Sequence, residues 1–237
     1  MKKILAAALS LAIISAKAQT ADDVINKYTA NMGGLDAFNK IASVKITGTY
    51  TTQGQDFPLT TQIINGKGMR TDIDIMDQPV TNCYYDGKGW KVNAFAGAPS
   101  PTEVSGSELN ELKTQSLLSS ALMDYKARGH QVEMQGEETV DGIKTFKIKL
   151  TSKEDGKVVT YFVSVADYTL IKSVTIRPIR GQDTDVESFY SDLKDVGGVK
   201  FFMNRDSRID GQVFQSFKYE KVELNATVDE KIFAMPK

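Results

Sequence analysis

The stretch Val44–Val92, VKITGTYTTQGQDFPLTTQIINGKGMRTDIDIMDQPVTNCYYDGKGWKV, decides the fold class. In its first segment apolar residues such as Val44 and Ile46 alternate with lysine and threonine. Asn-Gly at 65–66 and Asp-Gly at 86–87 separate similar segments, and these dipeptides supply the positive φ angles that tight hairpins need. Because period-two patterning around such turns indicates antiparallel strands, the stretch predicts an antiparallel sheet.

The same alternation returns after residue 130 and continues almost to the end of the chain. Phe146, Ile148 and Leu150 alternate with lysines, and Asp-Gly turns recur at 141–142 and 210–211. Counted in this way, the sequence predicts roughly ten or eleven strands and only two or three helices. We therefore expect a mostly β, α+β protein built on one curved antiparallel sheet.

An amphipathic helix is predicted near the start of the mature chain. Thr20 is a suitable N-cap, and Val24, Tyr28 and Met32 follow it on one face. A glycine pair after Met32 should end the helix, and a second short helix is predicted over residues 35–41.

A further helix is predicted between Ser105 and Arg128. Ser105 and Glu108 have the spacing of a capping box, and leucines recur on one face after them. Before this helix, small residues and two prolines at 94–101 indicate a loop. We expect the helix to lie over the sheet as a lid.

The expected numbers of strands and helices predict an apolar hollow. A long antiparallel sheet twists and curls, and a barrel wider than eight strands leaves room inside. Two or three helices are too few to fill the concave face of such a sheet. An apolar space should therefore remain between them.

Residues 1–18 have the organisation of a secretory signal peptide. Lys2 and Lys3 precede an apolar run, and an A-x-A cleavage site ends at Ala18. The run is too short for a membrane span, and no cysteine follows the site to carry a lipid anchor. We expect an exported protein of the bacterial periplasm, with one mature domain over residues 19–237.

Charge and cysteine content exclude some classes of protein. The chain has 29 basic and 30 acidic residues, a formal net charge of −1. Removal of the first 18 residues takes away three lysines and no acid, so the mature charge is −4. This balance is not that of a nucleic-acid-binding protein. Cys83 is the only cysteine, which excludes an internal disulfide and is best interpreted as a small buried hydrophobe.

The motifs of common active sites are absent from the sequence. His130 is the only histidine, and its place at a helix-to-strand junction favours a surface turn residue. No H-E-x-x-H, C-x-x-C, Walker or G-x-G-x-x-G motif is present. Asp72, Asp74 and Asp77 lie close together but lack the glycine and terminal glutamate of an EF-hand loop. We therefore predict no catalytic residue, no metal site and no cofactor.

Five segments that together span the mature chain carry a family resemblance. They are residues 25–41 with MGGL, 85–90 (YDGKGW), 129–133 (GHQVE), 138–148 (ETVDGIKTFKI), and 221–236 from KVELN to FAMP. In order and spacing they resemble the outer-membrane lipoprotein-sorting family, the LolA-like periplasmic carriers, in the version widespread in Bacteroidetes-type envelopes. The resemblance implies an unclosed β half-barrel with helices over a hydrophobic cavity, and transport of lipids or of the acyl chains of lipoproteins.

The first functional hypothesis is a carrier or sensor for a lipid or an acylated lipoprotein. Sequestering an acyl chain from water gains about 0.8 kcal/mol per CH₂ and needs no catalytic group. Such a protein would be a monomer that meets envelope membrane proteins and no nucleic acid. The residues predicted to line its hollow are Ile46, Ile63, Ile73, Ile75, Trp90, Leu118, Leu122, Phe146, Ile148, Phe162, Val174 and Ile176.

Two other interpretations stay open. A filled, non-catalytic β domain could dock on an envelope membrane complex or a peptidase, which predicts a normally packed core and an exposed apolar patch. A hydrolase with converging carboxylates is the third, although no particular pair is indicated. Trp90, the only tryptophan, is compatible with core packing as well as with ligand contact.

Overall fold

Thirteen strands of the computed structural model join in one antiparallel sheet; the model describes residues 19–179 and 181–236. The predicted signal peptide, residues 1–18, lies outside the described residues. The strands of the first half are β1 (Ser43–Thr52), β2 (Gln55–Ile64), β3 (Gly68–Ile75), β4 (Gln78–Tyr85), β5 (Lys88–Asn93) and β6 (Ala98–Val104). Those of the second half are β7 (Gln131–Val140), β8 (Ile143–Thr151), β9 (Val158–Ser164), β10 (Leu170–Ile179), β11 (Gln182–Val196), β12 (Val199–Ile209) and β13 (Gln212–Leu224).

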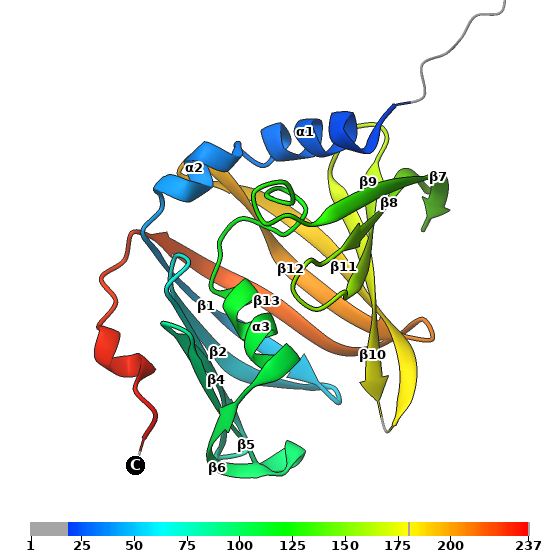
Figure 1. Cartoon of the computed structure of the whole chain (residues 1–237). Helices are drawn as coiled ribbons and strands as arrows, with labels where there is room; N and C mark the ends of the chain where they lie inside the picture. Colours follow the sequence, from blue (N-terminus) through cyan, green and yellow to red (C-terminus); the bar gives the residue numbers. More distant parts are fainter. Residues whose placement is uncertain (1–18, 180, 237) are drawn as a thin grey trace, which may run out of the picture.

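The strand order is β6-β5-β4-β3-β2-β1-β13-β12-β11-β10-β9-β8-β7, so β6 and β7 are the two free edges. The sheet curls around the helices without closing on itself (Figure 1). This confirms the predicted half-barrel, with thirteen strands where roughly ten or eleven were expected from the pattern. We call the face that carries the helices the concave face, and the opposite one the outer face.

The prediction of a loop at 94–101 is wrong. It contains a short 3₁₀ helix, η1 (Ala94–Ala96), and most of the edge strand β6. Prolines lack an N–H and disrupt central strands, but an edge strand leaves one side of its backbone unpaired. Pro99 and Pro101 are tolerated there because β6 pairs only with β5.

The two halves of the sheet meet where β1 pairs with β13, Val44 lying opposite Leu224. The register shifts after Thr47, and Gly48 follows. A Cβ atom on Gly48 would lie only 2.1 Å from the backbone carbonyl oxygen of Lys218. Glycine is therefore required by the close approach of the two backbones at this joint.

Three α-helices and a second 3₁₀ helix complete the described chain: α1 (Ala21–Asn31), α2 (Leu35–Lys40), α3 (Gly106–Gln115) and η2 (Glu230–Phe233). Thr20 caps α1 as predicted, because its Oγ1 accepts from the backbone N–H of Asp23 at 3.1 Å. The Asp23 carboxylate accepts in return from the Thr20 N–H, which completes a capping box.

The helix predicted between Ser105 and Arg128 is much shorter than expected. α3 ends at Gln115, and Ser105 makes no side-chain cap hydrogen bond. Serine side chains compete with a helical backbone for hydrogen bonds. The Ser116 hydroxyl donates to the carbonyl of Lys113 at 2.7 Å, and the Ser120 hydroxyl accepts from the N–H of Met123 at 3.2 Å. Residues 116–129 are consequently irregular; we call them the crossing segment.

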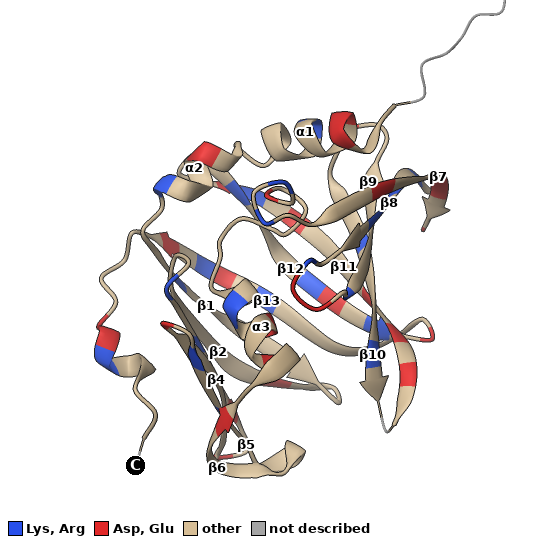
Figure 2. Cartoon of the chain, viewed as in Figure 1, with Lys and Arg blue, Asp and Glu red and all other residues tan. Residues whose placement is uncertain are grey.

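The main core lies between the concave face and a layer made by α1, α2 and the crossing segment. Val24, Ile25 and Tyr28 of α1 pack there with Leu122 and Ile148, all buried. This confirms the predicted apolar face of α1. Acidic and basic residues are interspersed along the strands rather than gathered in one block (Figure 2).

The end of the chain covers part of the outer face. After β13 it runs past β1 to β5 on the side away from α3 (Figure 1). Phe233 of η2 is buried there against Trp90 and Cys83, and the Trp90 indole N–H donates to the Phe233 carbonyl at 2.8 Å. Cys83 is fully buried, as predicted.

Candidate functional site

The candidate site is the part of the concave face that α3 covers. Leu112 of α3 is buried against Ile63, Met69 and Tyr84 of the sheet. A Cβ on Gly89 would lie 2.9 Å from Leu109, so the absence of a side chain there lets α3 approach β5 closely. One side of the helix thus rests on β3, β4 and β5.

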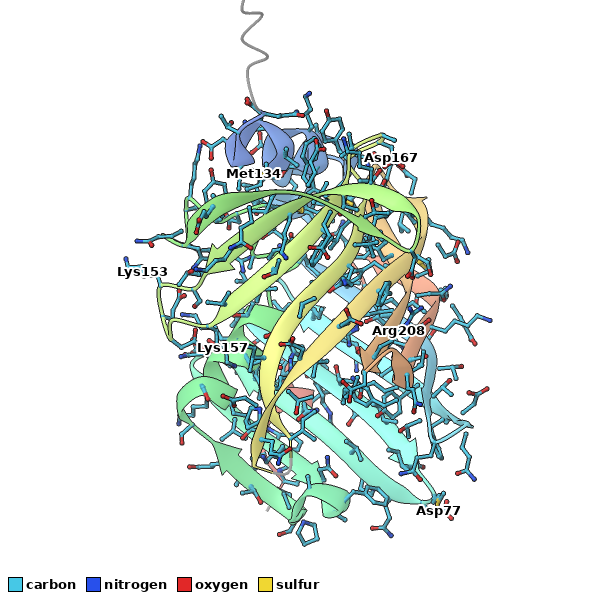
Figure 3. The ribbon with its side chains drawn as sticks, turned by 90° about the vertical axis from the view of Figure 1, so that its right-hand side faces the viewer. Asp77, Met134, Lys153, Lys157, Asp167 and Arg208 are labelled. Carbon is cyan, nitrogen blue, oxygen red and sulfur yellow. The ribbon has the colours of Figure 1, made fainter. Side chains whose placement is uncertain are left out.

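Ion pairs hold α3 at both of its sides. Glu108 accepts from Lys91 of β5 at 2.7 Å, which adds to the contact with the near wall. Glu111 reaches the far wall, where it pairs with Arg177 of β10 at 2.8 Å and with Lys157 at 3.4 Å. Lys157 lies at the end of the loop between β8 and β9 (Figure 3). α3 therefore spans the opening of the half-barrel.

The electrostatics of Glu111 keep this bridge charged at neutral pH. Partial burial raises the pKa of the Glu111 carboxyl, but the positive charges of Arg177 and Lys157, with their hydrogen bonds, outweigh it. The net result is a pKa below the usual value for glutamate. The carboxyl is therefore ionised over the physiological range.

Asn65 fixes the start of the crossing segment. Its Nδ2 donates to the carbonyls of Phe38 and Ile41 at 3.1 and 3.0 Å, and its Oδ1 accepts from the N–H of Leu118 at 3.1 Å. The N–H of Gly66 donates to the Ser116 carbonyl at 2.8 Å. The hairpin turn predicted from Asn-Gly thus also ties α2 to the crossing segment.

Beyond α3, the α1 end of the concave face is filled. Arg128 donates from Nη2 to the carbonyl of Ser119 at 2.7 Å, and its Nε lies 3.5 Å from the carboxylate of Asp124. Tyr28 is buried beneath this segment, and desolvation raises its pKa to about 12. Any ligand would have to lie toward the other end of the half-barrel.

Eight of the twelve residues predicted to line a hollow lie on the concave face or on the crossing segment above it. Four pack in the main core, and Leu118 lies between that core and the cluster under α3. Ile63 lies under α3, while Ile73 and Ile75 form a cluster farther along the strands. The eight are Ile46, Ile63, Ile73, Ile75, Leu118, Leu122, Phe146 and Ile148.

The other four, Trp90, Phe162, Val174 and Ile176, lie on the outer face, and their assignment to the hollow was wrong. Trp90 packs under the C-terminal segment. Phe162 lies opposite Lys147 and Lys172, whose ammonium groups are 5.6 and 4.6 Å from its ring centre. Val174 and Ile176 follow Lys172 at alternate positions of β10, so they share its face. These strands carry apolar residues on both faces, so their sequence pattern did not indicate which residues point inward.

A pocket of about 270 Å³ lies on the outer face over β2, β3 and β4. It is lined by Pro58, Thr60, Asp72, Ile73, Asp74, Asp77, Pro79 and Thr81. Asp72 is already engaged by Arg70 and by the hydroxyl of Thr81. Its acidic lining does not suit an acyl chain. No group of three or more His, Cys, Asp or Glu side chains is arranged to hold a metal within residues 19–179 and 181–236.

His130 differs from the predicted surface turn residue. Only 6% of its side chain is exposed, and its Nδ1 accepts from the N–H of Lys153 at 3.2 Å. Glu111, Arg177 and Lys157 are the residues that the sequence reasoning missed. Charged residues at alternating strand positions or on a polar helix face look like ordinary surface residues, so no sequence signal distinguished them.

No protein-family model matches the sequence, and no curated protein matches it. A LolA superfamily protein from Nitrosomonas europaea has a similar structure, with a TM-score of 0.57 at 12% identity over 92% of this chain and 98% of that one. The chain has a LolA-like fold.

Two further structures share this LolA-like fold. A DUF1329 family protein from Desulfovibrio piger matches with a TM-score of 0.57 at 13% identity, over 92% of this chain and 98% of its own. A domain from Vibrio parahaemolyticus, provisionally described as an outer membrane lipoprotein-sorting protein domain, matches with a TM-score of 0.59 at 11% identity, over 90% and 97%. At these identities the similarity shows the fold alone. Among the described residues, none of the helices has the length and apolar character of a membrane span.

Proposed function

We propose that this LolA-like protein is a non-enzymatic carrier of the bacterial envelope. It would hold a lipid, or the acyl chains of a lipoprotein, between the concave face and α3. The proposal rests on the way in which α3 is attached to the two walls of the sheet. The helix presents leucines to the sheet and reaches the far wall through Glu111. An apolar ligand could therefore separate α3 from one wall of the half-barrel while the helix stays attached to the other.

A comparison of free energies favours opening of α3 by a ligand. The Arg177 and Lys157 side chains are about half exposed, and exposed ion pairs typically contribute about 0–1 kcal/mol each. Burial of an acyl chain gains about 0.8 kcal/mol per CH₂. A few methylenes therefore offset the loss of both pairs.

An apolar surface next to α3 supports the same proposal. Leu59, Ile73 and Val80 are buried there under side chains that stay partly exposed. The partly exposed members are Tyr50, Phe57, Ile75, Phe217 and Tyr219. An acyl chain that replaced water over this surface would extend the core. The predicted signal peptide and the LolA-like fold favour the periplasm as the compartment.

Uptake of a fluorescent fatty acid tests the proposal, together with native mass spectrometry of protein purified from its own host. Ile75→Asn on the concave face should weaken uptake, whereas Ile176→Asn on the outer face should leave it unchanged. The two variants make the same chemical change on opposite faces of the sheet. Absence of co-purified lipid together with absence of uptake by the wild type would refute the carrier.

The alternative, a non-catalytic module that docks on an envelope membrane complex or a peptidase, is favoured by a different observation. The end of the sheet away from α1 exposes Met76 in the turn after β3, Phe95 of η1, and Val213 and Phe214 at the start of β13, the first two at 62%. Asp77, next to Met76, marks this end in Figure 3. A Phe95→Ser, Phe214→Ser variant that leaves the membrane fraction but still takes up lipid would assign docking to this rim. Unchanged membrane association would count against it.

A further inference from the structure

Arg205 is a charged residue on the concave face of β12. It lies opposite Tyr190 of β11 and Phe217 of β13, and its guanidinium carbon is 4.3 Å from the centre of the Phe217 ring. Both neighbours belong to the apolar clusters of this face. Two residues earlier in the strand, Met203 is buried. The concave face of β12 thus changes from apolar to cationic at Arg205.

The guanidinium of Arg205 has no acceptor in the described part of the chain. Its Nε is buried without a hydrogen-bond partner, and neither ion pairs nor hydrogen bonds are found for its other nitrogens among residues 19–179 and 181–236. Arginine is always charged and carries five N–H donors, and a buried donor without an acceptor is unfavourable. The Phe217 ring attracts the positive charge but satisfies none of the in-plane donors.

Polar side chains extend the surface around Arg205 toward the open end of the half-barrel. The Tyr50 hydroxyl donates to Gln215 at 3.3 Å, and the Gln215 amide donates to the Ser207 hydroxyl at 3.3 Å. Tyr50 also packs on Phe217, with ring centres 5.1 Å apart, beside the apolar cluster of Leu59, Ile73 and Val80. A polar patch with an unpaired cation therefore borders an apolar surface.

We propose that Arg205 binds the anionic head group, a carboxylate or a phosphate, of the lipid whose chain lies on the apolar surface next to α3. The inference rests on the proposed carrier function and specifies its ligand as an anionic amphiphile. A planar guanidinium pairs with two oxygens of a carboxylate or phosphate at once, and such charge-assisted bonds are about twice as strong as neutral ones. The same bonds would satisfy the donors that are free in this structure.

Arg208 provides a matched control on the same strand. It lies on the outer face, with its guanidinium carbon 3.9 Å from the centre of the Phe189 ring (Figure 3). Its Nε, like that of Arg205, is buried without a hydrogen-bond partner, but its Nη1 is 3.5 Å from the carboxylate of Asp141, so its charge already has an acidic partner. Both arginines therefore cover a phenylalanine ring, but only Arg205 faces the proposed ligand.

The test compares dodecanoate, dodecyl phosphate, dodecanol and inorganic phosphate at pH 8 by calorimetric titration of the wild type and three variants. The wild type should bind the two anionic amphiphiles roughly tenfold to a hundredfold more tightly than dodecanol, as expected for a hydrogen bond to a charged group. Arg205→Gln should lose this preference while it keeps dodecanol binding, and Arg205→Lys should retain part of it. Arg208→Gln should behave as the wild type.

Each of the other outcomes bears on the head-group inference or on the carrier function. Wild-type protein that binds dodecanol and dodecanoate equally would overturn the head-group inference and leave the carrier function standing, whereas binding of neither amphiphile would remove both. Inorganic phosphate that competes as strongly as dodecyl phosphate would identify a site for a free anion instead of a lipid. A preference that survives in Arg205→Gln would place the head group elsewhere. Circular dichroism and thermal unfolding of the variants check that they are folded.

Discussion

Glu111 is the residue through which α3 reaches the far wall of the sheet. One carboxylate there serves two cations on different elements, Arg177 on β10 and Lys157 before β9. Because both partners belong to the far wall while Glu111 is on the helix, this contact reports whether α3 is closed. The negative charge of Glu111 can be removed by substitution with glutamine, which has nearly the same side-chain volume.

We expect Glu111→Gln to loosen α3 without unfolding the protein. Loss of a partly exposed charge pair should weaken the closed position by about 1 kcal/mol, which would accelerate amide exchange in α3 roughly fivefold. Hydrogen exchange measured by mass spectrometry gives this rate. Glu108→Gln removes the pair with Lys91 on the near wall and should leave lipid-induced opening unchanged. Equal exchange in α3 of wild type and Glu111→Gln would contradict the bridge.

The same carboxyl gives a pH dependence with a definite sign. Its pKa is lowered in the folded protein, so the bridge is intact above the ordinary pKa of glutamate and is lost as pH falls through the lowered value. α3 exchange, corrected for intrinsic rates, should therefore be constant from neutral pH down to about pH 5 and should rise only in more acidic solution. In Glu111→Gln that acidic rise should be much smaller.

Cys83 should be nearly unreactive in the native protein. Burial raises the pKa of its thiol to about 12, and only the thiolate reacts with disulfide reagents. Labelling at pH 8 should be at least about a hundredfold slower in the native than in the unfolded protein. Rapid native labelling would mean that the C-terminal segment opens to expose it.

At the scale of the element, the C-terminal segment acts as a cover for the outer face. The Arg70 guanidinium donates to the carbonyl of Ile232 at 2.6 Å, and Lys67 pairs with Glu230 at 2.8 Å. Phe233 then fills the space beside Trp90 and stacks on Tyr85 with ring centres 5.1 Å apart. The segment has little regular structure, so these side chains hold it in place.

Phe233→Ala should destabilise the protein by about 3–5 kcal/mol, because it removes a buried aromatic ring and leaves a cavity. Chemical denaturation measures this loss. Trp90 is the only tryptophan, so a red shift of its fluorescence should accompany the exposure of the outer face. Met235→Ala, two residues later and at an exposed position, should change stability by less than about 0.5 kcal/mol.

At the scale of the whole molecule, the half-barrel depends on the joint between β1 and β13. This pairing brings residue 44 next to residue 224 and unites two sets of consecutive hairpins. The free edges at β6 and β7 remain apart, and α3 bridges the opening near them. The space available to a ligand is therefore set by the joint and by α3 together.

Gly48→Val should disrupt this joint. The added side chain would meet the backbone of β13 rather than a movable side chain, so the strands must separate. We expect a loss of at least about 2 kcal/mol in unfolding free energy, with thermal unfolding as the measurement. Thr47→Val, at the preceding position, exchanges one β-branched residue for another without that contact and should be nearly neutral. Similar stability of the two variants would contradict the steric argument.

Much of this architecture follows from local sequence alone. Alternation around 65–66 and 86–87 predicts the hairpins, because side-chain direction in a strand has a period of two and Asn-Gly and Asp-Gly favour positive φ. Thr20 and the apolar positions after it predict α1 for equally local reasons. Six of the predicted lining residues that face inward lie on strands, and alternation of apolar and polar side chains indicated them; Leu118 and Leu122 come from the apolar stripe of the crossing segment.

Tertiary structure decided the rest, because it depends on groups that are distant in the chain. Sequence patterning could not tell that Trp90 and Phe162 face outward, since a C-terminal segment and lysine side chains cover them. Glu111 meets Arg177 across 66 residues, and Arg205 lacks an acceptor only because its neighbours in space supply none. Local periodicity determined the strands and the first helix; long-range pairing determined which charges bridge the opening and left Arg205 without an acidic partner.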